Sequence, residues 1–366
     1  MRVLVAMSGG VDSSVAAALL AEAGHEVVGA TLKLWGGSSD SGCCSVADVD
    51  DARRVAQQLG IAHHVFDLTD DFAAAVVEPY VAAHAAGRTP NPCIECNRHI
   101  KFARLLDRAR RLGFDKLATG HHARVEPAAR RAPSGARNRR PDAAALQLLR
   151  GVDGAKDQSY VLSMLGQDQL ARLALPVGAL TKAEVRARAA RLGLRTAGKP
   201  DSQDVCFIRR DEGRRGFLAG RLELHPAEVV DLRSGRLVGS VPEAELVTVG
   251  QRRGVGHGPD GRRRYVVAVD VRRRRVTVAG PEDAVVRRVA LAPGSVTWVG
   301  APLPLGARAL AQVSAHGRAA PCTVAVRRGE AAVEFDEPQR PVAPGQTVAL
   351  YDPSDPDAVL GAGVAA

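Results

Sequence analysis

The chain has 366 residues, of which 46% are hydrophobic and 25% charged; this composition excludes a largely disordered protein, and the length predicts two or three domains. No stretch reaches the roughly 18 uninterrupted apolar residues that a membrane span needs, and the N-terminal apolar run turns glycine-rich too early for a signal peptide, so we expect a cytoplasmic protein with no membrane partner. The net charge of +10 is uneven: residues 1–100 contain 6 basic and 12 acidic side chains and the remainder 44 and 28, so either the later part docks a polyanion or its arginine-rich composition reflects genome bias.

The first 120 residues alternate between apolar runs and helical periodicity. A strand at 3–6, a glycine loop at 8–14, a helix at 15–23 and a parallel strand at 26–34 make a βαβ unit. The alternation continues with helices at 45–59, 71–85 and 96–112 and strands at 63–68 and 116–119. This order predicts an α/β domain built on a doubly wound parallel sheet with helices on both faces.

The later part of the chain changes character. Residues 126–143 carry five arginines and three prolines, which predicts a flexible loop or hairpin tip, and Thr181 with Glu184 forms a capping box at the start of a helix over 181–192. After residue 212 short apolar runs dominate, at 264–269, 275–279, 309–313, 322–326, 331–335 and 347–351. They predict mostly antiparallel β structure. We therefore divide the chain into an α/β domain at 1–211, a small central β-rich domain at 212–283 and a C-terminal β-barrel-like domain at 284–366.

The segment SGGVDSS at 8–14 lies directly between the first strand and the first helix. Its two glycines let the backbone approach a ligand, its hydroxyls can donate hydrogen bonds, and the first amides of a helix bind anionic oxygen. The loop has neither the lysine of a Walker loop nor GxGxxG spacing. It predicts a phosphate or pyrophosphate site.

Six cysteines are few for a disulfide scaffold of this length, so we interpret them as reduced thiols, a metal site or redox chemistry. In TPNPCIECNR at 89–98, two prolines precede Cys93 and Cys96. We expect Cys96 at a helix start, where the helix dipole and Arg98 favour a thiolate. The CxxC pair alternatively forms half of a zinc or iron–sulfur site. A third thiol, Cys206 in KPDSQDVCFI, suits a strand edge near a cleft.

The glycine loop resembles the PP-loop of ATP pyrophosphatases (adenine nucleotide alpha hydrolase-like), which cleave ATP to AMP and pyrophosphate. Taken together, several segments closely resemble the tRNA-specific 2-thiouridylases, the bacterial enzymes that thiolate the wobble uridine. They are AMSGGVDSSV at 6–15, CCSVADVDDARRVAQQLGI at 43–61, GRTPNPCIECNRHIKF at 87–102, ATGHHAR at 118–124, KDQSYVL at 156–162, KPDSQDVCFI at 199–208, VGQRRGVGHG at 249–258 and VEFDEPQRPVAPGQTVALYD at 333–352.

The resemblance implies an ATP-dependent enzyme, a tRNA-uridine 2-sulfurtransferase using magnesium. It implies that Cys96 is the nucleophile and that Cys206 carries a persulfide. ATP contacts are implied at Ala6, Met7, Ser8, Gly9, Gly10, Val11, Asp12, Ser13, Leu32 and Gly120. Contacts with tRNA are implied at His121, Lys156, Asp157, Gln158 and Gln346. The implied partners are the anticodon stem-loop of the Lys, Glu and Gln acceptor tRNAs and a sulfur donor such as a cysteine desulfurase or sulfur-relay protein.

Two departures from the family pattern matter. Many relatives have Asp where this chain has Cys93, so no carboxylate role transfers to that position. Relatives also carry an Arg-Tyr pair in a C-terminal β segment, whereas residues 312–318 here lack it, so RNA contacts in that segment do not transfer.

The expected chemistry has two stages. ATP adenylates the C2 oxygen of the uridine, and sulfur then displaces AMP. Either the Cys206 persulfide delivers that sulfur and a Cys96–Cys206 disulfide results, or hydrosulfide released from the pair attacks. In an alternative, Cys93, Cys96 and Cys206 hold a [4Fe-4S] cluster. Two other classes remain for comparison: a PP-loop synthetase acting on a small metabolite, and a non-enzymatic RNA-binding module, which gives no reason for the loop.

Overall fold

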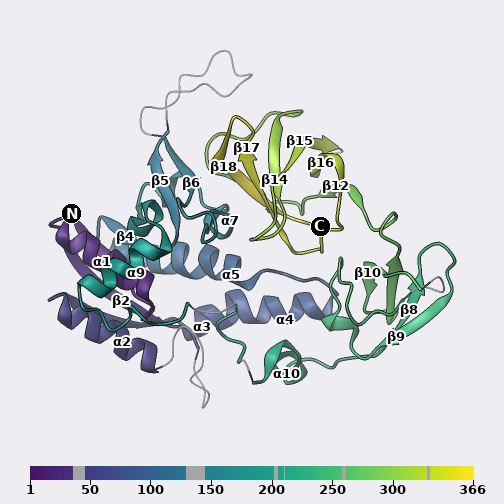
Figure 1. The fold of residues 1–366 in the computed structure, drawn as a ribbon, viewed down its shortest axis with the longest axis horizontal. Helices are drawn as coiled ribbons and strands as arrows, with labels where there is room; N and C mark the ends of the chain where they lie inside the picture. The colour runs from purple at the N-terminus through teal and green to yellow at the C-terminus, as the bar shows by residue number, and fades with distance from the viewer. Residues whose placement is uncertain (36–45, 129–144, 202–204, 210, 258–260, 328–329) are drawn as a thin grey trace.

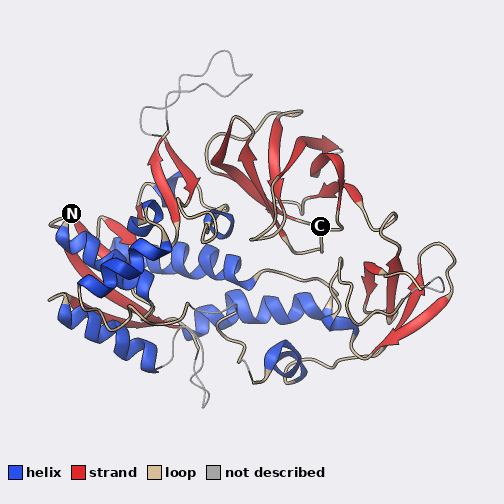
Figure 2. Ribbon diagram, in the orientation of Figure 1, coloured by secondary structure: helices blue, strands red, loops and turns tan. Residues whose placement is uncertain are grey.

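The computed structural model describes residues 1–366 except 36–45, 129–144, 202–204, 210, 258–260 and 328–329. These residues form three sheets, and most of the helices gather around the first of them (Figures 1 and 2). Cys43, Cys44 and most of the predicted loop at 126–143 lie outside the described residues. No helix in the described part of the chain is long and apolar enough to cross a membrane.

The first sheet is parallel throughout. Its order is β3-β2-β1-β4-β7, formed by β1 (Arg2–Ala6), β2 (Glu26–Lys33), β3 (Ala62–Asp67), β4 (Lys116–Ala118) and β7 (Leu173–Ala174). The chain leaves β1 toward β2 on one side and later returns to add β4 on the other. Strand order therefore reverses at β1, which is where open α/β sheets bind ligands.

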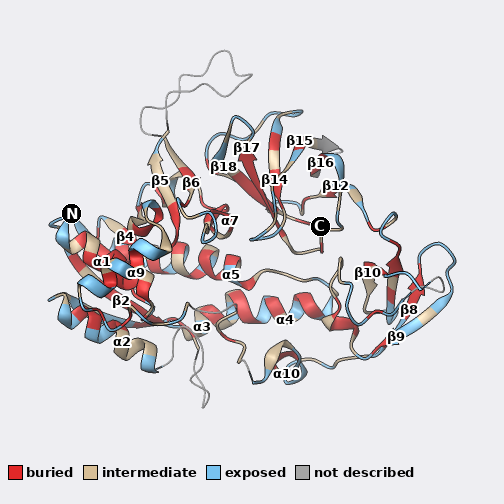
Figure 3. Cartoon of the chain, in the orientation of Figure 1, coloured by how far each residue is buried: buried red, intermediate tan, exposed pale blue. Residues whose placement is uncertain are grey.

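Helices cover both faces of this sheet, as predicted. Val3 and Val5 pack with α1 (Val11–Glu22), α2 (Val46–Gln58) and α9 (Lys182–Arg191). Leu4 points to the other face, because successive strand residues alternate, and joins the larger core. That face carries α3 (Thr69–Phe72), η1 (Ala73–Val77), α4 (Glu78–Ala85), α5 (Pro92–Glu95), η2 (Cys96–Leu105) and α6 (Leu106–Arg111). Figure 3 shows the buried residues along these strands and helix faces.

Three of the shorter helices lie within residues 1–211 and two within residues 212–283. They are α7 (Ser159–Leu162), α8 (Gln167–Leu170), η3 (Pro176–Ala179), α10 (Gly213–Ala219) and η4 (Ala244–Leu246). The predicted capping box of α9 is confirmed, since Thr181 Oγ1 accepts from the Glu184 amide and the Glu184 carboxylate accepts from the Thr181 amide.

The central sheet has the order β10-β11-β8-β9 around a valine-rich core of its own. Its strands are β8 (Ala227–Asp231), β9 (Leu237–Val241), β10 (Tyr265–Asp270) and β11 (Arg275–Ala279). The expected antiparallel structure is confirmed within each hairpin, but the two hairpins join through β11 and β8, which run parallel.

In the part of the chain that the structure describes, the C-terminal sheet has nine antiparallel strands, two of which come from the first domain. The hairpin of β5 (Ala123–Pro127) and β6 (Leu146–Arg150) joins it by pairing β6 with β18. The other strands are β12 (Val286–Ala290), β13 (Thr297–Trp298), β14 (Arg308–Gln312), β15 (Ala320–Arg327), β16 (Glu330–Gln339), β17 (Thr347–Asp352) and β18 (Asp355–Val364). One continuous sheet thus spans the predicted boundary at residue 211.

A buried polar joint strengthens this connection. The Arg150 guanidinium lies 3.8 Å from the centre of the Tyr351 ring and donates to Gln312 Oε1 at 2.7 Å. The Tyr351 and Ser159 hydroxyls are 3.0 Å apart, and the Tyr160 hydroxyl donates to the Thr347 carbonyl at 2.8 Å. Because buried polar groups are costly to leave unpaired, these contacts fix one arrangement of the two domains.

Gly178 in η3 makes the tightest approach to the hairpin. A Cβ at this position would lie 1.7 Å from the Ala123 carbonyl oxygen. We expect Gly178→Ala to lower the free energy of unfolding by about 3 kcal/mol, because a backbone group must move to admit one methyl. Thermal melting measures this. Gly154→Ala, whose Cβ would meet no heavy atom within 4 Å, is the control; equal melting temperatures for both variants would contradict the close packing.

Candidate active site

The glycine loop connects the carboxyl end of β1 to α1 at the point where strand order reverses. Gly10 is the N-cap of α1, so the free amides of the first helical turn face the loop. The hydroxyls of Ser13 and Ser14 donate to the Gly10 carbonyl at 3.1 and 2.8 Å, and Ser13 Oγ accepts from the Ser8 amide at 3.2 Å. In this state the serines shape the loop from within.

Two glycines allow close backbone packing around the loop. Gly9 has φ +69°, and a Cβ there would lie 2.2 Å from the Asp48 carbonyl oxygen. Gly120 follows β4, and its Cβ would lie 2.6 Å from the Ser13 amide nitrogen. The structure thus brings the predicted residue Gly120 directly onto the loop, although more than 100 residues separate them in the chain.

Of the remaining predicted nucleotide contacts, Ala6 ends β1 and Val11 begins α1, while Met7 and Leu32 lie on the strand side of the loop. Met7 continues β1, and its amide donates to the Ala30 carbonyl of β2 at 2.8 Å. Leu32 lies two residues further along β2 and is buried. Since β1 and β2 are parallel, these residues share the edge of the sheet that carries the loop.

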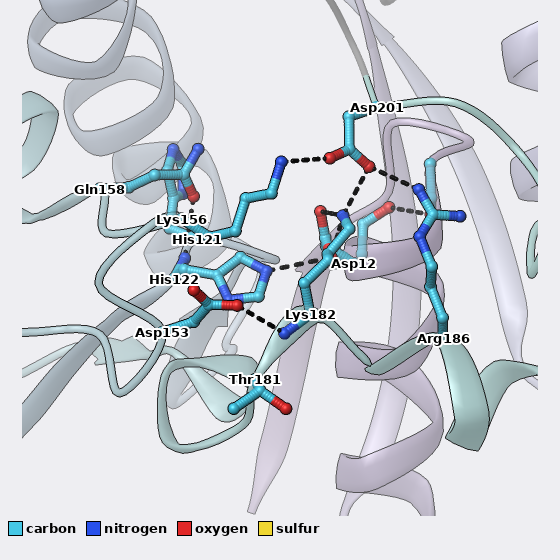
Figure 4. A network of polar contacts seen from close by, with 12 residues as sticks. Asp12, His121, His122, Asp153, Lys156, Gln158, Thr181, Lys182, Arg186 and Asp201 are labelled. Atoms are coloured by element: carbon cyan, nitrogen blue, oxygen red, sulfur yellow. Dashed lines mark hydrogen bonds and ion pairs between the residues drawn. The ribbon is translucent and has the colours of Figure 1, made fainter. Parts of the chain in front are cut away.

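Asp12 joins the loop to an ion-pair network that the sequence did not reveal (Figure 4). The Lys182 ammonium contacts the two Asp12 carboxylate oxygens at 2.8 and 2.7 Å, and His122 Nε2 lies 3.1 Å from one of them. Burial alone would raise the pKa of Asp12, but the hydrogen bonds with His122 and Lys182 outweigh it and hold the pKa below its ordinary value. Asp12 is therefore an ionised carboxylate.

Lys182 also reaches the motif that contains Cys206. Its ammonium lies 2.8 Å from Asp201, which also pairs with Lys156 and Arg186 at 2.8 Å each. Burial would raise the pKa of Asp201, but Lys156 and Lys182 hold it well below its ordinary value. The side chain of Lys182 is only 11% exposed, so water weakens its charge contacts little.

A second lysine ties the same motif to the loop. Lys199 donates to the Gly9 carbonyl at 3.0 Å and to the carboxylates of Asp48 and Asp51 on α2 at 2.5 and 2.7 Å. Lys199 and Asp201 stand in the predicted KPDSQD segment, but nothing local in the sequence indicates their partners. The signal for Lys182 was weaker still, because it follows a capping threonine and resembles an ordinary surface residue.

The helix that carries the cysteines begins earlier than predicted. It starts at Pro92, because Asn91 is the N-cap and its Oδ1 accepts from the amides of Cys93 and Ile94 at 3.1 and 3.4 Å. The expectation that Cys96 lies at a helix start is therefore wrong. Cys93 occupies the first turn and is exposed, whereas Cys96 follows one turn later, in η2, and is buried. The helix dipole consequently acts more strongly on Cys93.

Cys206 lies in a turn, so its predicted place at a strand edge is also wrong. The preceding Val205 has φ +50°, a strained conformation for a β-branched residue. The following Phe207 is buried, with ring centres 5.5 Å from Tyr80 and 5.1 Å from Phe217. This aromatic anchor explains the turn, because it draws the chain into the core instead of along a sheet.

The two cysteine segments border the same aromatic cluster. Burial raises the pKa of Tyr80, and the neighbouring Cys93 adds to the rise, while the Tyr80 ring packs on Phe207. Nevertheless, among the residues that the structure describes, no group of three or more His, Cys, Asp or Glu side chains is placed to hold a metal ion. Cys93, Cys96 and Cys206 therefore do not form a ligand set in this arrangement.

The five predicted RNA contacts have partners within the protein. The Asp157 carboxylate accepts from Arg150, the Gly151 amide and Ser159, and Gln158 Oε1 accepts from the His122 amide. Lys156 pairs with Asp201, and Gln346 donates to the Thr89 carbonyl. Burial lowers the pKa of His121 well below its ordinary value, so its ring, bonded to Thr119 at 2.7 Å, is neutral. Direct RNA contact by these residues stays a prediction.

Three family models match most of the chain. Residues 1–210 match the tRNA methyl transferase HUP domain family, residues 215–280 the tRNA methyl transferase PRC-barrel domain and residues 289–365 the aminomethyltransferase beta-barrel domain. These matches agree with the predicted fold class of a parallel-sheet domain followed by two β domains.

Curated relatives match over nearly their full length. The tRNA-specific 2-thiouridylase MnmA of Roseiflexus castenholzii is 47% identical over 99% of this chain and 98% of its own. The enzyme of the same name from Salinispora tropica is 47% identical over 99% and 98%, and that from Geobacter metallireducens 44% over 99% and 96%. A solved structure, the U34-tRNA thiolase NcsA of Methanococcus maripaludis with its [4Fe-4S] cluster, is distant: 18% identity, TM-score 0.36, covering 60% of this chain and 62% of that one.

Proposed function

Because the chain belongs to the tRNA-specific 2-thiouridylase family, we propose that it replaces the C2 oxygen of the wobble uridine, U34, in tRNA with sulfur at the expense of ATP. The observation that carries this proposal is the identity of 47% over 99% of the chain. The junction of Gly120 with Asp12 and Ser13 supports it, because it builds a tight anion-binding loop where the fold binds ligands.

We assign ATP to the loop of residues 6–13, with Leu32 and Gly120 beside it. The first amides of α1 suit the phosphates, and Asp12 with Lys182 fixes the helix start. The described residues offer no ready-made magnesium site, since both Asp12 oxygens already accept hydrogen bonds. Mg²⁺ in such enzymes binds mainly through substrate phosphates and water, so we expect it to arrive with ATP and to neutralise the phosphate charge.

The uridine oxygen is a poor leaving group until it is adenylated. In the proposed reaction the C2 oxygen attacks the α-phosphorus of ATP, and pyrophosphate leaves. The terminal sulfur of a Cys206 persulfide then attacks C2, and AMP leaves with the oxygen. Finally the Cys96 thiolate attacks Cys206 Sγ, which forms a Cys96–Cys206 disulfide and leaves the outer sulfur on the base. A cellular dithiol reductant restores both thiols.

The persulfide route uses Cys96 and Cys206, which both belong to the large core around the parallel sheet. Cys96 is buried and Cys206 partly buried, so the sulfur atoms are shielded from water. The cluster alternative needs Cys93 as a third ligand, and the described side chains do not form that set. We therefore propose the persulfide route.

The proposed partners are the anticodon stem-loop of tRNA and a cytoplasmic sulfur donor such as a cysteine desulfurase. Exposed arginines on the central domain, Arg272–Arg275 and the pair Arg252 and Arg253, supply positive charge for RNA phosphates. The target base has to leave the anticodon stack to reach the loop.

The direct test is thiolation of unmodified tRNA with ATP and either sulfide or a desulfurase, followed by nucleoside mass spectrometry. We expect 2-thiouridine at position 34 together with AMP and pyrophosphate. A synthetase acting on a small metabolite would instead release pyrophosphate with that metabolite and leave the tRNA unchanged, which would refute the proposal.

The affinities for tRNA and for ATP should respond differently to salt. We expect the affinity for tRNA to fall about a hundredfold between roughly 50 and 200 mM salt, because basic side chains that bind RNA phosphates release condensed counterions. The affinity for ATP should change far less, since the loop binds phosphate through backbone amides. Filter binding and calorimetry measure the two constants. A tRNA affinity that stays flat over this range would contradict the charge argument.

A further inference from the structure

The helix that carries Cys93 and Cys96 (Pro92–Leu105, the cysteine helix) follows a segment that hydrogen-bonds to the C-terminal domain. The Thr89 amide donates to the Pro344 carbonyl at 2.9 Å, and Gln346 Nε2 donates to the Thr89 carbonyl. Gly345, with φ +89°, brings its backbone so close that a Cβ would lie 3.3 Å from the Pro90 nitrogen. The turn at 343–346 thus hydrogen-bonds to Thr89 and packs closely against Pro90, immediately before the helix cap at Asn91.

A second contact joins the same parts of the molecule. Asn97, in the turn after Cys96, donates from Nδ2 to the Val161 carbonyl of α7 at 3.0 Å. In α7 the Tyr160 hydroxyl donates to the Thr347 carbonyl, next to Gln346. Residues 346–347, at the start of β17, therefore contact both the segment before the cysteine helix and α7, which bonds to Asn97 of that helix.

We propose that Gln346 is a positioning residue for Cys96, which couples the docking of RNA on the C-terminal domain to the placement of the cysteine helix. The inference rests on the proposed function, because it takes Cys96 as the nucleophile. The resemblance implies that Gln346 contacts tRNA, yet in the described structure its side-chain amide donates a hydrogen bond to the Thr89 carbonyl. An RNA group that took this amide would remove the donor from the Thr89 carbonyl and loosen the segment that leads to Cys96.

The side chain of Gln346 is suited to this role. The Thr89–Pro344 hydrogen bond joins two backbone groups and survives when a side chain changes. The Gln346 amide is a contact that a substitution can remove, and its partner Thr89 lies 7 residues before Cys96 in the chain. Asn91 then passes any displacement into the first turn, because its side chain holds the amides of Cys93 and Ile94.

The test measures alkylation of Cys96 in the RNA-free full-length protein, localised by peptide mass spectrometry. Gln346→Glu keeps the size of the side chain and removes the donor, and Gln346→Met removes it without adding charge. We expect Cys96 to react about fivefold faster in both variants, the order expected when one hydrogen bond no longer opposes local opening. Gln339→Glu is the matched control, since in the contacts described the Gln339 side chain bonds the Glu337 carbonyl of its own strand.

Cys322 serves as an internal reference for global unfolding. It is buried in the C-terminal sheet, and burial raises its pKa to about 12, so it reacts only when that domain opens. Faster labelling of Cys96 together with Cys322 would overturn the proposal, because the variants would then merely unfold the protein.

Unchanged labelling of Cys96 with weaker tRNA binding would also overturn it, because Gln346 would then be an RNA contact alone. Because the proposal has an RNA group take the Gln346 amide, we expect both variants to bind tRNA a few-fold more weakly as well as to label faster at Cys96. The labelling uses no tRNA, so it is independent of the proposed function. If the wild-type protein thiolates no tRNA, that function fails whatever the labelling shows.

Discussion

Cys206→Ser is expected to abolish the thiolation of tRNA when a cysteine desulfurase supplies the sulfur. The rate should fall by a factor of about 10³ or more, because a serine hydroxyl cannot carry a sulfane sulfur and the step has no substitute nucleophile. Binding of ATP should be unchanged, since Cys206 packs against the large core, whereas the glycine loop offers the phosphates the first amides of α1. Nucleoside mass spectrometry and calorimetry measure the two effects.

Two further variants make this result specific. Cys322→Ser alters a thiol buried in the C-terminal sheet, whose Sγ lies 3.3 Å from the Ala309 carbonyl oxygen, and should thiolate normally. Cys93→Ser should also remain active under the persulfide route, whereas a three-cysteine cluster requires it. Iron bound after anaerobic purification, lost together with activity in Cys93→Ser, would favour the cluster. Continued thiolation by Cys206→Ser would refute the persulfide assignment.

Lys182→Met is expected to weaken ATP binding by about 30-fold. The substitution leaves the Asp12 carboxylate, which is only 29% exposed, without its main cation beside the incoming phosphates, and removing one partner of a largely buried ion pair typically costs several kcal/mol. Lys182→Arg should restore part of the affinity because it keeps the charge. Isothermal titration with ATP measures each dissociation constant.

A double substitution distinguishes repulsion by the uncompensated Asp12 charge from structural disruption caused by Lys182→Met. Asp12→Asn combined with Lys182→Met should bind ATP more tightly than Lys182→Met alone, since the uncompensated charge is gone. Lys116→Met is the control: Lys116 lies at the opposite end of the parallel sheet and bonds a backbone carbonyl at Ala171. If the double variant were no better than Lys182→Met, repulsion by Asp12 would not be the cause.

The parts of the site that are local in sequence could be predicted. The glycine loop between β1 and α1 is recognisable because a strand, two glycines and a helix follow one another directly. Parallel β1 and β2 then fix where the loop lies in the sheet. The α/β part of the fold class followed from the alternation of strands and helices, and the parallel sheet agrees with it.

The network around Asp12 could not be predicted, because its members meet only in three dimensions. Lys182 follows Asp12 by 170 residues, and no periodicity relates a helix N-terminus to a distant loop. The pairing of β6 with β18 is equally remote. The start of the cysteine helix, in contrast, could have been predicted from the local sequence. Asn91 before Pro92 is a typical N-cap followed by proline at the first helical position.

The pairing of β6 with β18 bears on how the protein emerges from the ribosome. Leu149 pairs with Ala358, more than 200 residues later, so at 5–20 residues per second β6 waits roughly 10–40 s for its neighbour. During that interval its open edge can pair with strands of other nascent chains. Its short length of five residues limits such pairing. A chain released before β18 is synthesised lacks the strand that covers this edge, so premature release of the chain is the step most prone to aggregation.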